Sequence, residues 1–251
     1  MVVDRGQLVW SAAFGLRRKN PELPMTPETT LWAGSVTKAV FGTYVMQLAE
    51  REGLPLDVPI AEQLGKPLDS YEVYRESGTA LVADRFGAAE QFLAQTRRFP
   101  ARAAGSMTTS AEDLAKFVLA LFEGRILQTD VQKKMLLPAV KIRTVHQFPM
   151  PNDAAEGSEA SRVGLAYGMG WGLLTKTKYG RAFFKEGHGD GAQNYMICFE
   201  KRQTCMIVLT NNDNGELAFR PLFEKILGNT VTPWEWESYT PEAIAALRNL
   251  Q

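Results

Sequence analysis

Segments that favour β-strands stand at the two ends of this 251-residue chain, and helical segments fill the middle. At the start, Val2-Val3 and Gln7 to Phe14 flank the turn Asp4-Arg5-Gly6, a pattern typical of a β-hairpin. Near the end, apolar stretches from Arg181 onward are joined by short turns, which indicates an antiparallel meander. We therefore predict an α/β (α+β) fold whose antiparallel sheet is built from N- and C-terminal strands, with helices on both faces.

The middle of the chain predicts a separate, reduced helical lobe. Helices are expected over Ser70 to Ala83, Phe86 to Thr96 and Thr108 to Gly124, the last with a capping box at Thr109 or Ser110. We place the sheet domain at residues 1–60 and 160–251 and the helical lobe at residues 61–159.

The strongest chemical pattern is a serine followed three residues later by a lysine. Ser35 and Lys38 open an amphipathic helix that runs to Glu52, so both side chains share one helical face. An amine that burial has made less basic can activate a serine hydroxyl, and a helix N-terminus favours developing negative charge there. The competing interpretation is an N-capping serine followed by a solvated lysine.

Composition excludes several other classes of function. Lys+Arg and Asp+Glu both number 28, so nothing predicts a nucleic-acid partner. No apolar run reaches the length of a membrane span. Residues 1–15 lack a signal-peptide pattern, so we expect a periplasmic or secreted protein if the N-terminus was trimmed and a cytoplasmic one otherwise.

The cysteines and histidines are too few for a disulfide framework or a metal centre. Cys198 and Cys205 would face each other across a hairpin that turns at Lys201-Arg202. We expect them to be small buried side chains without a bond, because direct cross-strand disulfides tend to be strained.

Several motifs occur in a characteristic order. They are Ser35-x-x-Lys38, the helix Thr108 to Gly124, the glycine-rich stretch Gly164 to Gly172, the run Gly187-His188-Gly189-Asp190-Gly191, and a strand ending Leu209-Thr210-Asn211. This set resembles the serine β-lactamase-like superfamily, which includes class C β-lactamases, D-alanyl-D-alanine carboxypeptidases and family VIII-type esterases. The resemblance extends from about Val2 to Gly228.

The resemblance implies a role for each matching residue. Ser35 would be the acylated nucleophile, Lys38 its proton acceptor, and His188 the basic residue of the third motif. The backbone N–H groups of Ser35 and Gly191 would form the oxyanion hole. Substrate contacts would come from Gly189, Asp190 and Asn194, and neither a metal nor an organic cofactor is implied.

Two departures from the family pattern stand out. Asp190 replaces the usual glycine, where a carboxylate would either repel an anionic substrate or hold His188 by a hydrogen bond. The second motif, Tyr-x-Asn or Ser-x-Asn, is missing, since no tyrosine here has Asn two residues later. Tyr71 and Tyr74 lie in the corresponding part of the chain but in a different setting.

We therefore predict a serine hydrolase that forms an acyl-enzyme on Ser35 with a small molecule: a β-lactam, a D-Ala-D-Ala-like peptide or a small ester. The alternative is a degenerate relative that binds such ligands without turning them over, because the second motif is missing. A third possibility is a structural or partner-binding domain that retains only the sheet.

Overall fold

A computed structural model describes residues 1–53, 73–76, 82–95, 98–148 and 157–248. Its centre is an eight-stranded antiparallel sheet in the order β11-β12-β13-β14-β15-β16-β1-β2. The strands, in that order, are Val140–Lys141, Leu165–Tyr167, Gly172–Leu174, Ala182–Gly189, Ala192–Phe199, Thr204–Leu209, Val2–Asp4 and Gln7–Trp10. Pairing of β1 with β16 joins the two ends of the chain, which confirms the predicted sheet.

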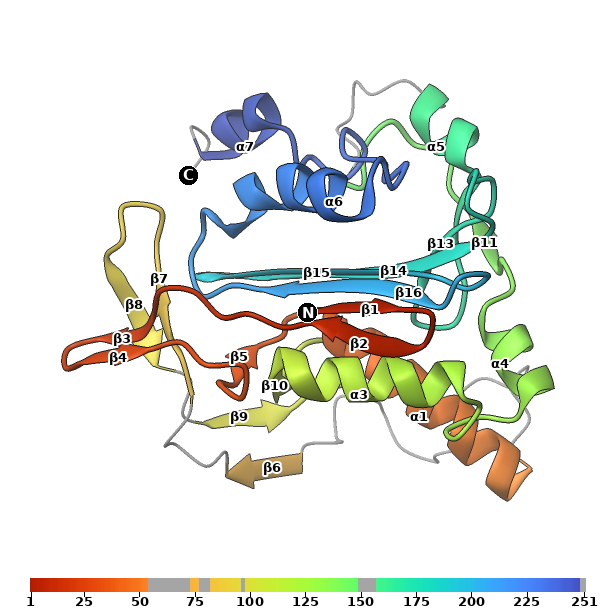
Figure 1. Cartoon of the computed structure of the whole chain (residues 1–251), viewed down its shortest axis with the longest axis horizontal. Helices are drawn as coiled ribbons and strands as arrows, with labels where there is room; N and C mark the ends of the chain where they lie inside the picture. Colours follow the sequence, from red (N-terminus) through yellow and green to blue (C-terminus); the bar gives the residue numbers. More distant parts are fainter. Residues whose placement is uncertain (54–72, 77–81, 96–97, 149–156, 249–251) are drawn as a thin grey trace.

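Helices cover both faces of this sheet (Figure 1). On one face lie α1 and α3, and on the other lie α6 and α7. The helices are α1 (Val36–Glu52), α3 (Ala111–Phe122), α4 (Thr129–Met135), α5 (Ser158–Val163), α6 (Phe219–Leu227, after the 3₁₀ turn η3, Gly215–Ala218) and α7 (Pro241–Arg248). Each face of the sheet therefore has its own apolar core.

The two cores divide the residues of the central strands between them. Val36, Leu114 and Phe183 belong to the core beneath α1 and α3. Phe184, Tyr195 and Phe219 belong to the core beneath α6. Because successive residues of a strand point to opposite faces, β14 and β15 contribute to both cores and are buried along almost their whole length.

The start of α3 and the end of α1 agree with the sequence prediction. The Ser110 hydroxyl caps α3 by accepting the N–H of Asp113 at 3.1 Å, one of the two expected capping boxes. Gly53 ends α1 in the left-handed conformation. The sequence predicts an apolar stripe on α1 formed by Val36, Val40, Tyr44, Val45 and Leu48. That stripe is partly wrong, since Tyr44 is exposed while Thr43 and Met46 are buried.

The region between the two halves of the sheet differs from the prediction. The expected helices over 70–83 and 86–96 are wrong where the structure describes them, because β6 (Val73–Glu76), β7 (Asp84–Phe86) and β8 (Phe92–Gln95) are strands. Tyr71 lies outside the described residues. A further strand, β9 (Arg98–Ala101), pairs with β6. These short strands form hairpins or pair with distant segments, and local sequence patterns carry little of that information.

Two other short segments also form strands. The polar, proline-containing run from Arg17 to Thr30 is typical of a loop. The structure instead has a hairpin of β3 (Leu16–Lys19) and β4 (Glu22–Pro24) there. β5 (Leu31–Trp32) pairs with β10 (Thr108–Thr109), just before the serine. This second pair brings the segment that precedes α3 alongside the start of α1.

Cys198 and Cys205 face each other in the register of β15 and β16, as the hairpin pattern predicts. The expectation that they stay unbonded is wrong, because the two sulfur atoms form a disulfide. Both residues are fully buried in the core beneath α1 and α3.

Candidate active site

Ser35 occupies the position before the first residue of α1, where serine hydroxyls usually cap a helix. Its hydroxyl makes no capping hydrogen bond. Instead, the Ser35 Oγ accepts a hydrogen bond of 2.7 Å from the Lys38 Nζ. The capping interpretation is therefore wrong for Ser35, and the structure brings together the two residues of the motif.

Lys38 is held in place from a second direction. Its Nζ also donates to the Ala104 carbonyl at 2.7 Å, in the segment that β5–β10 pairing brings alongside. Partial burial and the positive charge of Lys185 lower the pKa of Lys38, while Glu186 acts in the opposite direction. Because a neutral amine can accept a proton from the serine, this shift favours the role of a base.

Three glycines let the turn that carries Ser35 press against β14. A Cβ on Gly187 would lie 2.1 Å from the Ala33 carbonyl oxygen, and one on Gly189 would lie 2.0 Å from the Trp32 ring. Gly34, at φ +53°, would place a Cβ 2.9 Å from the backbone N and O of His188. Gly189 is thus a packing position beneath Trp32, and the glycines of both motifs are required for this close approach.

Two polar side chains that the pattern did not identify as anchors fix this turn. The Thr37 hydroxyl donates to the Gly34 carbonyl at 2.6 Å and accepts the N–H of Met107 at 3.1 Å. Trp32 donates its indole N–H to the Gly105 carbonyl at 2.6 Å. Thr37 lies inside the Ser-x-x-Lys motif, and that position was the only signal available in the sequence.

Asn194 is an anchor rather than a ligand contact. Its side chain is fully buried, and its amide donates to the carbonyls of Trp32 at 3.0 Å and Gly187 at 3.1 Å. Its Oδ1 accepts the N–H of Thr210. Every polar atom of the Asn194 side chain is engaged inside the protein, so none is left to contact the substrate expected there.

The tip of the β14–β15 hairpin is arranged differently from the expected oxyanion hole. The Gly191 N–H donates to the Asp213 Oδ1 at 2.5 Å, so this donor already has an acceptor. Ser35 N–H has no acceptor among the described residues. Of the two expected oxyanion donors, the Ser35 N–H therefore has no acceptor among the described residues, whereas the Gly191 N–H already donates to Asp213.

Arg85 from β7 closes over the same tip. Its guanidinium lies 4.9 Å from the centre of the Trp32 ring and donates to the Asp190 carbonyl at 2.8 Å. Asp190 is exposed, and it is Glu216, 3.1 Å from the Nε2 of His188, that supplies the carboxylate beside the imidazole. The exposed position of Asp190 therefore requires neither a hydrogen bond to His188 nor repulsion of an anionic substrate.

The His188 imidazole lies on the face of β14 opposite Ser35. Its neighbours Gly187 and Gly189 face the serine turn, and strand alternation turns His188 toward α6 and α7. There the Nε2 contacts both Glu216 and the hydroxyl of Tyr239. The backbone of His188 adjoins the site, but its ring points away from Ser35 and Lys38, so it is not placed as the basic residue expected of the third motif.

A buried group of charges lies beside the site on β14. The ammonium of Lys185 contacts the carboxylate of Glu186, and both side chains are almost fully buried. Burial tends to raise the pKa of Glu186, but the adjacent charge and hydrogen bond of Lys185 lower it. The Gln147 amide also donates to Glu186 at 2.9 Å.

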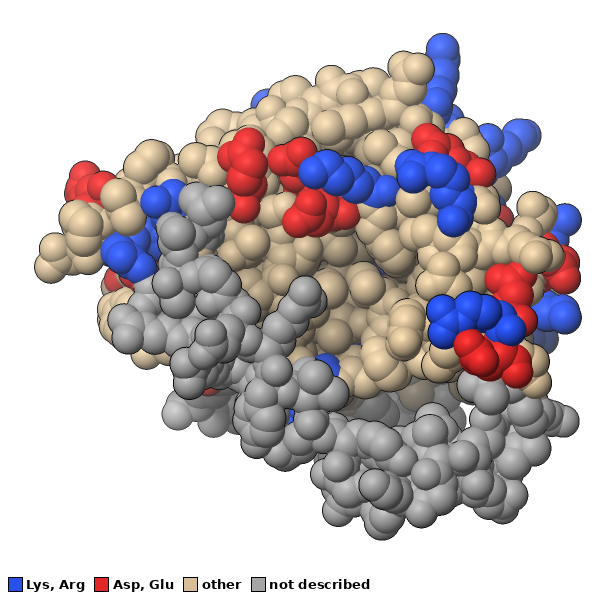
Figure 2. All heavy atoms as spheres, turned by 90° about the horizontal axis from the view of Figure 1, so that it is seen from below, with Lys and Arg blue, Asp and Glu red and all other residues tan. Residues whose placement is uncertain are grey.

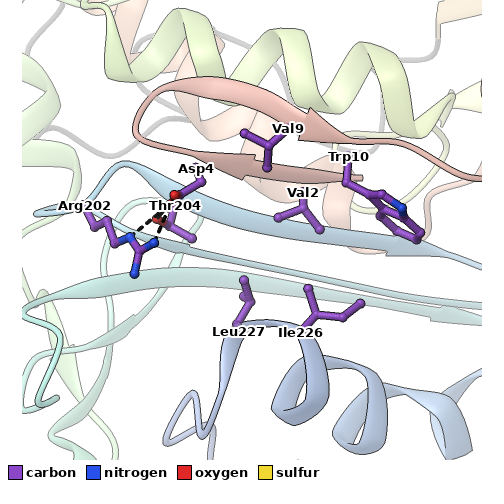
Figure 3. A pocket seen from close by; sticks show the side chains of 8 residues that line it. All are labelled: Val2, Asp4, Val9, Trp10, Arg202, Thr204, Ile226 and Leu227. Carbon is purple, nitrogen blue, oxygen red and sulfur yellow. Dashed lines mark hydrogen bonds and ion pairs between the residues drawn. The ribbon is translucent and has the colours of Figure 1, made fainter.

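A separate groove lies near the other end of the sheet (Figure 3). It encloses about 560 Å³ between the β1–β2 hairpin and α6. Its apolar lining includes Val9, Trp10 and Ile226, while Asp4 and Arg202 pair at one end. Because the serine turn packs at residues 187–189 and this groove borders Thr204, the two features are distinct.

Charges on the described surface are mixed. Figure 2 shows basic and acidic side chains next to one another on the face seen from below. Within the described part of the chain, no three His, Cys, Asp or Glu side chains gather to hold a metal ion. None of the helices that the structure describes is long and apolar enough to cross a membrane.

Comparison with known proteins decides the family. The family model described as Beta-lactamase matches residues 1–72 and 72–227, which is most of the chain. The chain belongs to the beta-lactamase family. The comparison with curated proteins finds no significant relative.

Solved structures share the fold of this beta-lactamase family member at low sequence identity. An octameric penicillin-binding protein homologue from Pyrococcus abyssi is 15% identical with a TM-score of 0.68, over 94% of this chain and 75% of that one. A penicillin-binding protein from Bacillus halodurans is 12% identical with a TM-score of 0.65, over 88% and 94%.

A further structure is EstCE1, described as a hydrolase with promiscuous acyltransferase activity. It is 13% identical with a TM-score of 0.61, over 97% of this chain and 92% of that one. These likenesses confirm the predicted fold class and the resemblance to the β-lactamase-like superfamily.

Proposed function

We propose that this protein is a serine hydrolase that forms an acyl-enzyme on Ser35. The observation that carries the proposal is the 2.7 Å contact between the Lys38 Nζ and a Ser35 hydroxyl that makes no cap. Membership in the beta-lactamase family supports it. The small-molecule substrate would be a β-lactam, a D-Ala-D-Ala-like peptide or a small ester.

In the proposed reaction, the Ser35 Oγ attacks the carbonyl carbon while the neutral Lys38 amine takes the hydroxyl proton. The C–N or C–O bond then breaks, and the proton on Lys38 passes to the departing amine or alcohol. An acyl ester on Ser35 remains, which water hydrolyses to the free acid. The N–H of Ser35 would donate to the carbonyl oxygen as it gains negative charge.

A second candidate function is ligand binding, or acylation, without turnover. It is favoured by the hydrogen bond that commits the Gly191 N–H to Asp213. With one oxyanion donor engaged, the tetrahedral intermediate loses stabilisation of the kind that typically changes kcat by about 10²–10³-fold. Acylation and deacylation both pass through such an intermediate, so both steps would then be slow.

Labelling with a fluorophosphonate and with a fluorescent penicillin, followed by a chase, tests both candidates. We expect a covalent label on the Ser35 peptide by mass spectrometry, and none on Ser35→Ala. Label that persists through the chase would favour the non-turnover candidate. No label on the wild type, or equal label on Ser35→Ala, would contradict both acylation proposals. Ser11→Ala, far from the motif in sequence, is the matched serine control.

A further inference from the structure

We propose that His188 is a positioning residue, which holds the Ser35 turn from the far side of β14 and takes no part in proton transfer. Glu216 and Tyr239 would hold the imidazole, and the backbone of His188 would in turn fix Gly34, the residue before Ser35. The inference rests on the proposed function only where its test measures acylation.

The side chain of His188 points away from the serine turn. The positions on either side of His188 have no room for a Cβ on the serine face, because Ala33 and Trp32 occupy it. A strand residue between two such positions points to the opposite face. Register agrees, since His188 pairs with Gln193 and Glu186 pairs with Tyr195, which is in the core beneath α6.

The partners of the imidazole are themselves packed in the protein. The ring centroids of His188 and Tyr239 are 5.3 Å apart, and the Tyr239 hydroxyl contacts the Nε2. Tyr239 is itself buried and packs against Tyr195 and Phe219, at centroid distances of 6.0 and 5.5 Å. Glu216, in η3, contacts the same nitrogen at 3.1 Å. The imidazole is therefore tied to the layer that contains α6 and α7.

The backbone of His188 lies against the turn that carries Ser35. An added Cβ on Gly34 would stand 2.9 Å from both the N and the O of His188, so the two backbones touch. Val36 N–H and Thr37 N–H donate to Ala33 and Gly34, so the turn is continuous with the start of α1. A shift of the His188 backbone would therefore move Ser35 relative to Lys38.

Four variants test the proposal: His188→Gln, His188→Ala, Tyr239→Phe and Glu216→Gln. Glutamine can keep a polar contact to Tyr239 and Glu216 but cannot act as an acid or base near neutral pH. We expect His188→Gln to label within about threefold of the wild type, whereas loss of a general base typically costs about 10²–10⁴-fold. His188→Ala should slow labelling by about tenfold to a hundredfold, the range expected when a nucleophile is misplaced.

The remaining variants test whether the three side chains act as one unit. Tyr239→Phe and Glu216→Gln should each slow labelling less than His188→Ala. Combined with His188→Ala, neither should add a further effect, because residues in one hydrogen-bonded network are not additive. His146→Ala is the matched control for loss of a histidine.

A second readout does not depend on activity. Hydrogen–deuterium exchange of the peptide that covers residues 32–40 should be faster in His188→Ala and Tyr239→Phe, with α3 peptides unchanged. If His188→Gln labels as poorly as His188→Ala while exchange stays at the wild-type rate, the positioning role is refuted. Unchanged exchange in every variant also refutes it. Wild-type protein that takes no label refutes the proposed function instead, and exchange still decides this inference.

Discussion

Near the end of β14, the two faces of the strand contact different parts of the protein. On the face toward α1, Gly187 and Gly189 have no side chains, and the turn that carries Ser35 fills the space. On the other face, Glu186 and His188 project into a layer of aromatic and acidic residues. The backbone of β14 contacts the Ser35 turn on one side, and its side chains are anchored on the other. In this way β14 can position the nucleophile although it does not contain it.

The largest effect that would test this difference is expected at Lys38, on the serine face. Lys38→Met should lower the rate of Ser35 labelling by about 10²–10⁴-fold, because the proton acceptor is lost. In the wild type, the labelling rate should rise with pH as Lys38 loses its proton, with a midpoint below the ordinary pKa of 10.5. Stopped-flow labelling across pH measures both. A wild-type rate that does not change with pH would contradict Lys38 as the base.

Next in size is the glycine that admits the serine turn. Gly187→Ala places a methyl group 2.1 Å from a backbone oxygen, so the turn must move. We expect labelling to fall by about a hundredfold, the cost of misplacing a nucleophile. Gly105→Ala is the matched control, since its Cβ would make only ordinary contacts at 3.6 Å or more. Equal rates for the two variants, with both folded by circular dichroism, would show that close approach is unimportant.

A smaller effect is expected at Asn194, which pins the turn without touching substrate. Asn194→Ala leaves the part-buried carbonyl of Trp32 and the buried carbonyl of Gly187 without this donor. We expect the free energy of unfolding to fall by about 1–3 kcal/mol. Urea denaturation measures it, with exposed Asn229→Ala as the control. If stability is unchanged and only KM rises, Asn194 contacts substrate after all.

The smallest effect belongs to the far face. Burial, and then the charge of Glu186, raise the pKa of Glu237 well above its ordinary value. The folded state therefore holds a proton that the unfolded state releases near pH 4.5, so stability should decline as pH rises from there through the raised pKa. Glu237→Gln, which keeps a neutral group beside Tyr195, should flatten this decline in thermal melts while Ser35 labelling stays the same. A pH dependence equal to that of the wild type would show that another group is responsible.

The sequence predicted the parts of the site that are local. Ser35 and Lys38 meet because three residues along a helix return to the same face, and the spacing states this directly. The β14–β16 meander likewise follows from apolar strands and short turns. These features depend on neighbours along the chain or on simple alternation.

The parts that failed depend on which face a residue takes and on distant partners. To predict that His188 points away from Ser35, one must know which alternate residues of β14 face the serine turn. The motif spacing does not give this information. The motif pattern predicts that the Gly191 N–H belongs to the oxyanion hole, but Asp213, from another segment, accepts it. In the same way, Ala104 beside Lys38 becomes apparent only when β10 pairs with β5.

The pairing of β1 with β16 also has a consequence for how the chain is made. Val2 and Val3 lie opposite Met206 and Cys205, and the N-terminal amine donates to the Ile207 carbonyl. During vectorial synthesis, the first strand has no partner on that side until some 200 further residues have left the ribosome. Contacts of such long sequence separation slow folding and prolong exposure of unpaired strands. β1 should therefore lack this partner, and the Ser35 turn should lack its packing against β14, until the later strands of the sheet have been synthesised.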